Sequence, residues 1–278
     1  MQSRLRVVPT IVSSSQIAMN SLIILPAEFV SDSEAMLQGE RANYALERHE
    51  LKVGIKVAAS RLSGKRGWAL VKAASRQKVV LEVFLDKDPP QKADIELIVA
   101  VPRPQTVKKI ILAACCLGVG RIHFLKTANV VKSYLQSKSL QPENIQQEII
   151  KGLEQAFDTV PPEVLIHSHY PKFIRESLPK VLGEKESANP IKLIADTRVS
   201  SDLTSKSVGF AADSQPVVIA IGPESGWTAE EAGDFKNLGF ISITLGERIL
   251  RVDAAATVLI AQVNLLRLLK PELNGQNI

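Results

Sequence analysis

The stretch IGPESGWTAEE, residues 221–231, decides how the C-terminal part of this 278-residue chain folds. The apolar run PVVIAI leads into it and stops at Gly222-Pro223, because proline cannot continue a central strand. Thr228 stands three residues before Glu231, which is the spacing of a helix capping box. The stretch therefore predicts a buried strand, a tight loop and a helix. Such a loop lies at the carboxyl end of a strand, where open α/β sheets bind ligands, although a plain turn without a ligand has the same pattern.

A second loop of the same kind follows about twenty residues later, in LGERILRVDAAATVLIAQV, residues 245–263. The run FISITL precedes it, and a long helix is expected from about Asp253, which would cap that helix. Ile249 and Leu250 offer an apolar wall, and Arg251 lies just before the helix. Two glycine-bearing loops at successive strand ends can form one pocket that supplies backbone amides, apolar side chains and a charge.

The chain from Ile95 onwards alternates between apolar runs and amphipathic segments. The expected strands are IELIVAV (95–101), RIHFL (121–125), EVLIH (163–167), IKLIA (191–195), PVVIAI (216–221) and FISITL (240–245). The expected helices between them are 106–119, 142–157 and 171–182, and the first of these takes Thr106 as its N-cap and ends at Gly118. This alternation predicts an α/β fold with a parallel sheet.

Residues 19–86 have a different rhythm, with short β-type runs at 21–25, 55–60, 67–75 and 78–85. Glycine-containing turns such as SGKRG separate these runs, which is typical of a small β-barrel. The proline-containing stretch DKDPPQKA, residues 86–93, has the composition of a linker. We therefore expect two domains, over 19–88 and 94–278. Residues 1–18 contain arginine and serine without acidic residues, as transit peptides do, but Met19 opens a strand-like run, so we expect 1–18 to be a disordered extension.

Composition and charge indicate the kind of partner and the cellular compartment that this protein is suited to. The chain is 45% hydrophobic and 23% charged, with a net charge of +5. Residues 41–80 contain ten lysines and arginines against Glu47 and Glu50, which favours a polyanionic partner, although a solvated basic face is the alternative. Cys115 and Cys116 are neighbours without a further cysteine, which suits the reducing cytoplasm and a buried helix face.

Several classes of protein are excluded by the motifs. The run GVGRIH at 118–123 lacks the third glycine of a dinucleotide fingerprint and follows a helix. Ser225 is out of register for a hydrolase elbow, and all four histidines precede it. The HSH pair at 167–169 has no second cluster of zinc ligands, and no phosphate-binding GxxxxGK[ST] occurs. Apolar runs are too short to span a membrane. We expect neither a metal nor a membrane partner.

The two loops together, IGPESGW and LGERILRVDAAA, resemble the paired signature of the SPOUT methyltransferases. More narrowly, they resemble the RsmE-type family of small-subunit ribosomal RNA (uracil-N3)-methyltransferases, with usual forms close to IGPEGG and LGxRILRxETA. The runs LGVGRI and GLEQAFDTVPPEV also match, so that the resemblance covers the chain from Met19 onward. Three features depart from the family: Ser225 replaces a glycine, Asp253 replaces a glutamate, and Phe157-Asp158 stand where a more polar, often arginine-containing sequence is usual.

The resemblance implies an N-terminal PUA-like β-barrel and a C-terminal SPOUT α/β domain with a deep trefoil knot. It implies S-adenosylmethionine as the cofactor, small-subunit (16S) ribosomal RNA as the partner and a homodimer with its active site near the subunit interface. The matching cofactor-loop positions are Ile221, Gly222, Pro223, Glu224, Gly226, Leu245, Gly246, Ile249, Leu250 and Arg251. The basic barrel would hold RNA phosphates, with Arg41, Arg48, Lys52, Arg61, Lys65 and Arg66 as candidate contacts. Tyr44 and Trp68 are aromatic side chains there that could stack on bases, although Trp68 also suits a buried core.

The chemistry assigns roles to two residues. Uracil N3 carries a proton, so the enzyme must help to remove it or stabilise the resulting anion. We expect Arg251 to stabilise that anion, with an ion pair to Glu247 or Asp253 as its alternative role. Glu224 is either the base or a residue that holds the loop by accepting amide hydrogen bonds. A SPOUT enzyme acting on tRNA or at a ribose, and an RNA-binding module without catalysis, remain the alternative functions.

Overall fold

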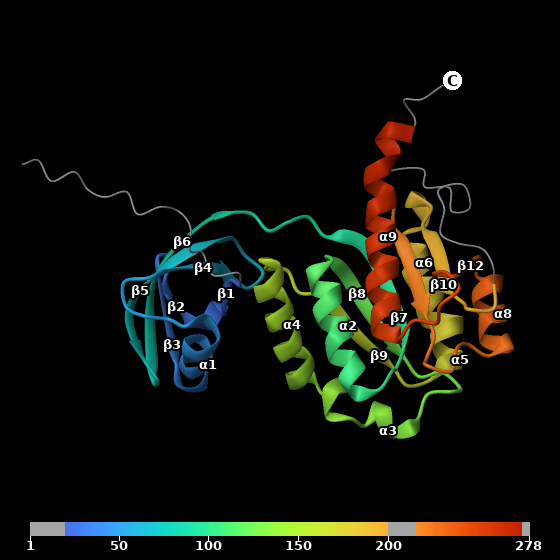
Figure 1. Cartoon of the computed structure of the whole chain (residues 1–278), viewed down its shortest axis with the longest axis horizontal. Coiled ribbons are helices and arrows are strands. Elements are labelled where there is room, and N and C mark those ends of the chain that lie inside the picture. The colour runs from blue at the N-terminus through green and yellow to red at the C-terminus, as the bar shows by residue number, and fades with distance from the viewer. Residues whose placement is uncertain (1–19, 200–214, 274–278) are drawn as a thin grey trace, which may run out of the picture.

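The computed structural model describes residues 20–199 and 215–273, with side chains up to Leu268. Figure 1 shows a smaller N-terminal body in blue and a larger α/β body in green to red, connected by an extended linker. The extension predicted over residues 1–18 lies outside the described residues.

In the described residues, the N-terminal body is a mixed sheet with one α-helix and a short 3-10 helix, Pro26–Glu28. Within the described residues, six strands lie in the order β1-β4-β5-β6-β3-β2, and β1 pairs with β4 in parallel while the other pairs are antiparallel. The elements are β1 (Leu22–Ile24), β2 (Phe29–Ser31), β3 (Glu34–Gln38), α1 (Gly39–His49), β4 (Lys56–Arg61), β5 (Arg66–Ser75) and β6 (Lys78–Lys87). The four strands expected from the apolar runs are confirmed. The helix α1 was not anticipated, because alanines form much of its buried face and no side chain caps its N-terminus.

The C-terminal body is a parallel α/β sheet, as predicted. Its strands lie in the order β12-β10-β11-β7-β8-β9, and every neighbouring pair is parallel. The strands are β7 (Ala93–Ala100), β8 (Val119–Leu125), β9 (Glu163–His167), β10 (Ile191–Ala195), β11 (Val217–Ile221) and β12 (Ile241–Ile243). The helices are α2 (Pro104–Cys116), α3 (Lys132–Leu135), α4 (Pro142–Ala156), α5 (Tyr170–Lys172), α6 (Leu178–Glu184), α8 (Ala229–Asn237) and α9 (Val252–Leu273).

Helices cover the central strands. Helix α2 packs between α4 and α9 (Figure 1). A π-helical turn, Phe173–Ser177, joins α5 to α6, and the Phe173 ring lies 5.9 Å from the ring of His123 on β8 and 4.6 Å from that of His167 on β9. All five residues of β11 are buried, as expected for a central strand of a covered parallel sheet.

Two predicted helix caps are wrong. Helix α2 begins at Pro104 with Arg103 at the N-cap position, so Thr106 lies buried inside the first turn. Proline needs no backbone hydrogen bond at the first helical position, which lets the helix start earlier than the threonine. In α9 the Arg251 carbonyl accepts from the Ala255 amide at 2.8 Å, so Asp253 lies within the first turn instead of capping it. Gly118, at a φ of 72°, follows α2 as expected.

Candidate functional site

The loop after β11 has the predicted strand, turn and helix. Gly226, at a φ of 75°, donates its amide to the Pro223 carbonyl at 2.8 Å and closes a tight turn. The capping box is confirmed: the Thr228 Oγ1 accepts from the Glu231 amide at 3.1 Å, and the Glu231 Oε2 accepts from the Thr228 amide at 2.9 Å. The loop is therefore fixed where it enters α8.

Glu231 does more than cap this helix. Its carboxylate is buried, and its Oε1 accepts from the amide of Ala128 in the loop after β8 at 2.8 Å. Asn129 of the same loop donates from Nδ2 to the Gly226 carbonyl at 3.4 Å. The loops after β8 and β11 are thus held together. The TxxE motif predicted the cap, but no local signal predicted a partner 103 residues away.

Gly222 has no side chain because the indole ring of Trp227 packs closely against its backbone. The side chain of Trp227 is 5% exposed, and its indole Nε1 donates to the Ala195 carbonyl at the end of β10 at 3.1 Å. A Cβ on Gly222 would lie 3.1 Å from that Nε1. The glycine therefore lets Trp227 turn under the loop and join the ends of β10 and β11.

Glu224 is tied to the loop after β7. Its Oε1 accepts from the Arg103 backbone amide at 3.1 Å and lies 4.0 Å from the Arg103 Nε. The amide hydrogen bond agrees with the loop-holding alternative predicted for Glu224. The part played by Arg103 was missed, because PRP at 102–104 matches no functional motif.

The loop between β12 and α9 presents side chains to solvent. Gly246 has a φ of 109°, and its carbonyl accepts from the Thr244 Oγ1 at 3.1 Å. Leu245 packs partly against the core, whereas Ile249 is 83% exposed and Leu250 is 36% exposed. Exposed apolar residues of this size, next to a helix N-terminus whose first amides have no partner within the helix, form a surface suited to a ligand with a flat apolar part.

Arg251 is exposed and forms an ion pair with Asp253. Its side chain is 71% exposed, and its Nε lies 3.4 Å from the Asp253 Oδ1. Lys109 of α2 lies 3.5 Å from the other oxygen of Asp253. Of the two ion-pair partners considered for Arg251, the structure shows Asp253. An exposed ion pair of this kind is weak, so the guanidinium can turn to another anion at little cost.

The end of β10 lies between the two loops. Ala195 accepts the Trp227 hydrogen bond, while the next amide, of Asp196, donates to the Ile243 carbonyl at the end of β12 at 2.9 Å. The Asp196 carboxylate binds the Arg198 guanidinium at 2.7 and 2.9 Å, and this pairing lowers the pKa of Asp196. The two predicted loops are therefore neighbours at the carboxyl edge, with Asp196 and Arg198 between them.

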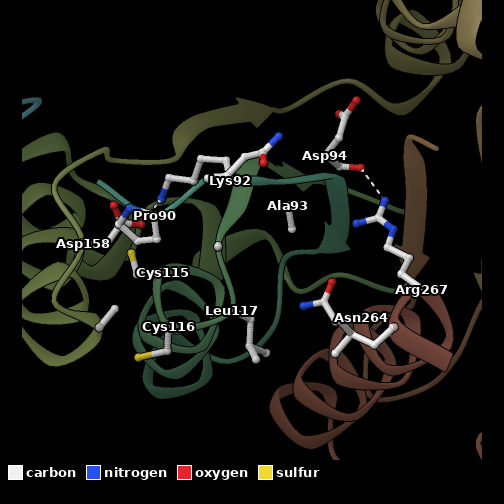
Figure 2. Close-up of a pocket in the computed structure, with 14 residues that line it drawn as sticks. Pro90, Lys92, Ala93, Asp94, Cys115, Cys116, Leu117, Asp158, Asn264 and Arg267 are labelled. Carbon is white, nitrogen blue, oxygen red and sulfur yellow. Dashed lines mark hydrogen bonds and ion pairs between the residues drawn. The ribbon is translucent and has the colours of Figure 1, made fainter. Parts of the chain in front are cut away.

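A cavity of about 700 Å³ opens away from these loops, between the linker, the C-terminal end of α2 and α9. Figure 2 shows Lys92 directed at Asp158 on one side and Arg267 directed at Asp94 on the other. Burial raises the pKa of the neighbouring Cys115 thiol to about 12, so this group stays protonated at neutral pH. The cavity includes none of the predicted cofactor-loop residues.

The candidate RNA contacts on the N-terminal body divide into two groups. Arg41 binds Glu28 at 2.8 Å and the Ile23 carbonyl at 2.7 Å, and Arg66 binds the Asp88 and Phe157 carbonyls at 3.0 and 3.1 Å. The exposed members are Arg48, Lys52, Arg61 and Lys65, and Arg61 lies 4.8 Å from the Phe29 ring.

The aromatic candidates have partners inside the protein. The Tyr44 hydroxyl donates to Glu154 at 2.6 Å. Trp68 stacks on Phe84 with ring centroids 4.0 Å apart, and the Lys56 Nζ lies 4.2 Å from the Trp68 ring. Trp68 therefore has a structural role within the N-terminal body, whereas Tyr44 connects that body to α4 of the other.

Two other features are absent from residues 20–199 and 215–273. No group of three or more histidine, cysteine, aspartate or glutamate side chains is arranged to hold a metal ion there. In the same part of the chain, no helix combines the length and the apolar character that a bilayer crossing requires.

Comparison with known proteins gives consistent matches. Residues 89–264 match the family described as RNA methyltransferase domain. A protein of Treponema pallidum named ribosomal RNA small subunit methyltransferase E is 31% identical over 217 residues, which cover 77% of this chain and 78% of that protein. A protein of the same name from Mesomycoplasma hyopneumoniae is 25% identical over 69% of this chain and 78% of its own length.

Solved structures share the fold. A ribosomal RNA small subunit methyltransferase E from Neisseria gonorrhoeae, bound to S-adenosyl methionine, superposes with a TM-score of 0.67 at 22% identity, covering 88% of this chain and 98% of that one. A methyltransferase from Legionella pneumophila in complex with the same cofactor gives 0.67 at 21% identity, over 88% and 97% of the two chains.

Proposed function

The chain belongs to the RNA methyltransferase family whose members are named ribosomal RNA small subunit methyltransferase E, and from this premise we propose that it methylates N3 of a uridine in small-subunit (16S) ribosomal RNA with S-adenosylmethionine as the methyl donor. One observation carries the proposal. The two loops with the family's paired signature lie at the carboxyl edge of one parallel sheet and are joined through the end of β10. That edge is where such sheets bind ligands.

We propose that the two bodies are the domains expected from the sequence, a PUA-like β-barrel over residues 19–88 and a SPOUT domain with a deep trefoil knot over 94–278. The strand order supports a knot, because the last strand, β12, lies beyond β10 while α9 returns to pack on α2. The segment between β12 and α9 therefore crosses back over the carboxyl edge. Location in the cytoplasm stays a prediction.

The residues at this edge fit the proposed cofactor. S-adenosylmethionine, when bound, supplies a methyl group on a positively charged sulfur. The exposed Ile249 and Leu250 offer the apolar surface that an adenosyl group needs, and the glycines at 226 and 246 leave open space beside the backbone. The proposed cofactor residues are Ile221, Gly222, Pro223, Glu224 and Gly226 of the first loop, and Leu245, Gly246, Ile249, Leu250 and Arg251 of the second.

Arg251 is the proposed catalytic residue. Loss of the N3 proton of uracil to solvent leaves a negative charge shared with the two carbonyl oxygens. The Arg251 guanidinium, exposed and loosely paired with Asp253, can donate to those oxygens and stabilise the charge. Glu224 keeps the loops after β7 and β11 in place through its hydrogen bond with the Arg103 amide.

We further propose that the protein works as a homodimer. Helix α9 presents two leucines three positions apart, Leu265 at 52% exposure and Leu268 at 76%. A second copy packed on this face would cover apolar surface that is otherwise in water. Light scattering after size exclusion tests this, with a Leu265→Glu, Leu268→Glu variant expected to be monomeric.

Two measurements test the proposed function. Calorimetric titration with S-adenosylmethionine should give saturable binding to the wild type. Small-subunit ribosomal RNA incubated with enzyme and cofactor should then yield 3-methyluridine on nucleoside analysis. A ribose-methylated nucleoside, or product only with tRNA, would identify a different SPOUT activity. Failure of the folded protein to bind the cofactor, with and without RNA, would leave an RNA-binding module.

A further inference from the structure

The two bodies of the chain meet at residues 154–159, the end of α4 and the turn that follows it. Glu154 is 0% exposed and projects from α4 into the N-terminal body. Its Oε2 accepts from the Tyr44 hydroxyl at 2.6 Å, and its Oε1 accepts from the Ile23 amide at 3.3 Å. His49, itself buried, places its Nε2 at 3.4 Å from Oε1. These partners of the Glu154 carboxyl group all belong to the N-terminal body.

The turn after α4 adds a second set of contacts. Thr159 donates from Oγ1 to the Gly64 carbonyl at 2.7 Å, and its own carbonyl accepts from the Ser63 amide at 2.8 Å. The Phe157 carbonyl accepts from Arg66 at 3.1 Å. The turn between β4 and β5 is therefore hydrogen-bonded to the methyltransferase domain.

Asp158 completes the junction from the linker side. Its carboxylate binds Lys92 at 2.7 Å, at the edge of the cavity in Figure 2, and accepts from the Thr159 and Val160 amides. Phe157 and Asp158 are two of the residues at which the sequence departs from the family's usual pattern. In the structure the Phe157 carbonyl binds Arg66 of the N-terminal body, and the Asp158 carboxylate binds Lys92 of the linker.

These contacts hold the bodies in one relative position. A linker such as residues 88–92 by itself permits domain motion, which is the default when an interface is small. A buried carboxyl group is costly unless hydrogen bonds satisfy it, so a shift that kept Glu154 buried but moved Tyr44 and Ile23 away would leave it without these donors. Burial, together with the hydrogen bond to Glu154, raises the pKa of Tyr44, and its hydroxyl therefore remains a donor at neutral pH.

We propose that Glu154 is a positioning residue for the RNA substrate, which it serves by fixing the N-terminal body on the methyltransferase domain through Tyr44 and Ile23. This inference rests on the proposed function. Arg61 and Lys65, two of the exposed candidate phosphate contacts, flank the Ser63-Gly64 turn that is bound to Thr159. The distance from these cations to the cofactor loops is therefore set by the junction. Because the two bodies are already fixed, RNA binding does not lose the entropy that aligning two mobile bodies would cost.

The experiment compares Glu154→Gln and Tyr44→Phe with Gln155→Ala, an exposed neighbour on the same helix. The rate of hydrogen exchange at the Ile23 amide and in residues 62–66 measures how often the junction opens. Calorimetry with S-adenosylmethionine shows whether the distant cofactor loops remain folded. RNA binding by anisotropy, with kcat and KM on small-subunit ribosomal RNA, reports positioning. Tyr44→Phe removes one hydroxyl and keeps the ring, so it tests the junction even where Glu154→Gln folds poorly.

The two test variants should exchange faster at the junction, bind the cofactor as the wild type does, and lose about tenfold in kcat/KM for RNA, mainly through KM, which corresponds to about 1.4 kcal/mol. Gln155→Ala should behave as the wild type in every assay. Unchanged exchange, or faster exchange with unchanged RNA affinity and KM, would overturn the proposal. A wild type that binds RNA but methylates none would instead contradict the proposed function, and its RNA affinity would still test the junction.

Discussion

The junction at residues 154–159 and the loop between β12 and α9 at the carboxyl edge of the parallel sheet differ in how exposed their side chains are. At the junction, Glu154 and Thr159 are buried and hydrogen-bonded to the other body. At the edge, Arg251 is 71% exposed and Ile249 is 83% exposed. Groups that are satisfied internally hold the architecture, whereas exposed groups on fixed loops are available to a ligand. Substitutions at the two regions should therefore affect different measurements.

The largest effect is expected from Arg251→Ala. If this guanidinium stabilises the uracil anion, kcat should fall by about 10²- to 10³-fold, as for the loss of one donor to a developing charge. Affinity for S-adenosylmethionine should fall far less than kcat, because the other nine proposed cofactor residues of the two loops remain in place. Arg248→Ala, which removes an exposed arginine from the same loop, is the matched control. Near-normal turnover by Arg251→Ala would remove this residue from the mechanism.

The next effect is expected from Gly222→Val. The new side chain would begin 3.1 Å from the Trp227 indole and push it off the Ala195 carbonyl. Overpacking of this kind costs about 1–3 kcal/mol, and we expect cofactor affinity to weaken by roughly tenfold to a hundredfold. Calorimetry gives the affinity. Gly233→Ala on α8, where a Cβ meets nothing within 4 Å, should bind as the wild type does; equal weakening in both variants would mean that the Trp227 contact is irrelevant.

A partly buried histidine, His167, should affect stability without affecting cofactor binding. Burial, followed by the neighbouring His123, lowers the pKa of His167 to about 4. The unfolded state then binds more protons than the folded state between about pH 6.5 and 4, so the free energy of unfolding should decrease as the pH falls through that window.

Urea unfolding at a series of pH values measures this dependence. His167→Gln should reduce the slope between pH 6.5 and 4 by up to about one proton, while cofactor affinity at pH 7 stays the same. A slope equal to that of the wild type would show that His167 does not titrate in this window.

The smallest effect concerns the exposed lysines of the N-terminal body. Lys65→Ala should lower the slope of log K for RNA against log salt by about 0.7–0.9, which is the loss of one phosphate contact. Arg41→Ala should leave that slope unchanged and lower stability instead, because Arg41 is bound to Glu28 and Ile23. Anisotropy titrations between about 50 and 200 mM salt make the comparison. Equal slopes for Lys65→Ala and the wild type would remove Lys65 from the RNA contacts.

Local signals predicted much of the fold. Long apolar runs gave the strands of the parallel sheet, and the TxxE spacing gave the cap of α8, because these patterns depend on residues close in sequence. Helix α1 was missed because its buried face is largely alanine, and the caps of α2 and α9 were misplaced because several neighbouring residues suit those positions.

The sequence by itself determined the parallel α/β sheet, the two glycine-bearing loops at strand ends and the family that these loops indicate. The tertiary structure decided how those loops are joined and how the two bodies are fixed. Three glutamates accept hydrogen bonds from residues more than a hundred positions away in the sequence. The pairs are Glu231 with Ala128, Glu224 with Arg103, and Glu154 with Tyr44. Periodicity and turn signals describe neighbours along the chain, whereas these contacts depend on the strand order and on the docking of one body against the other.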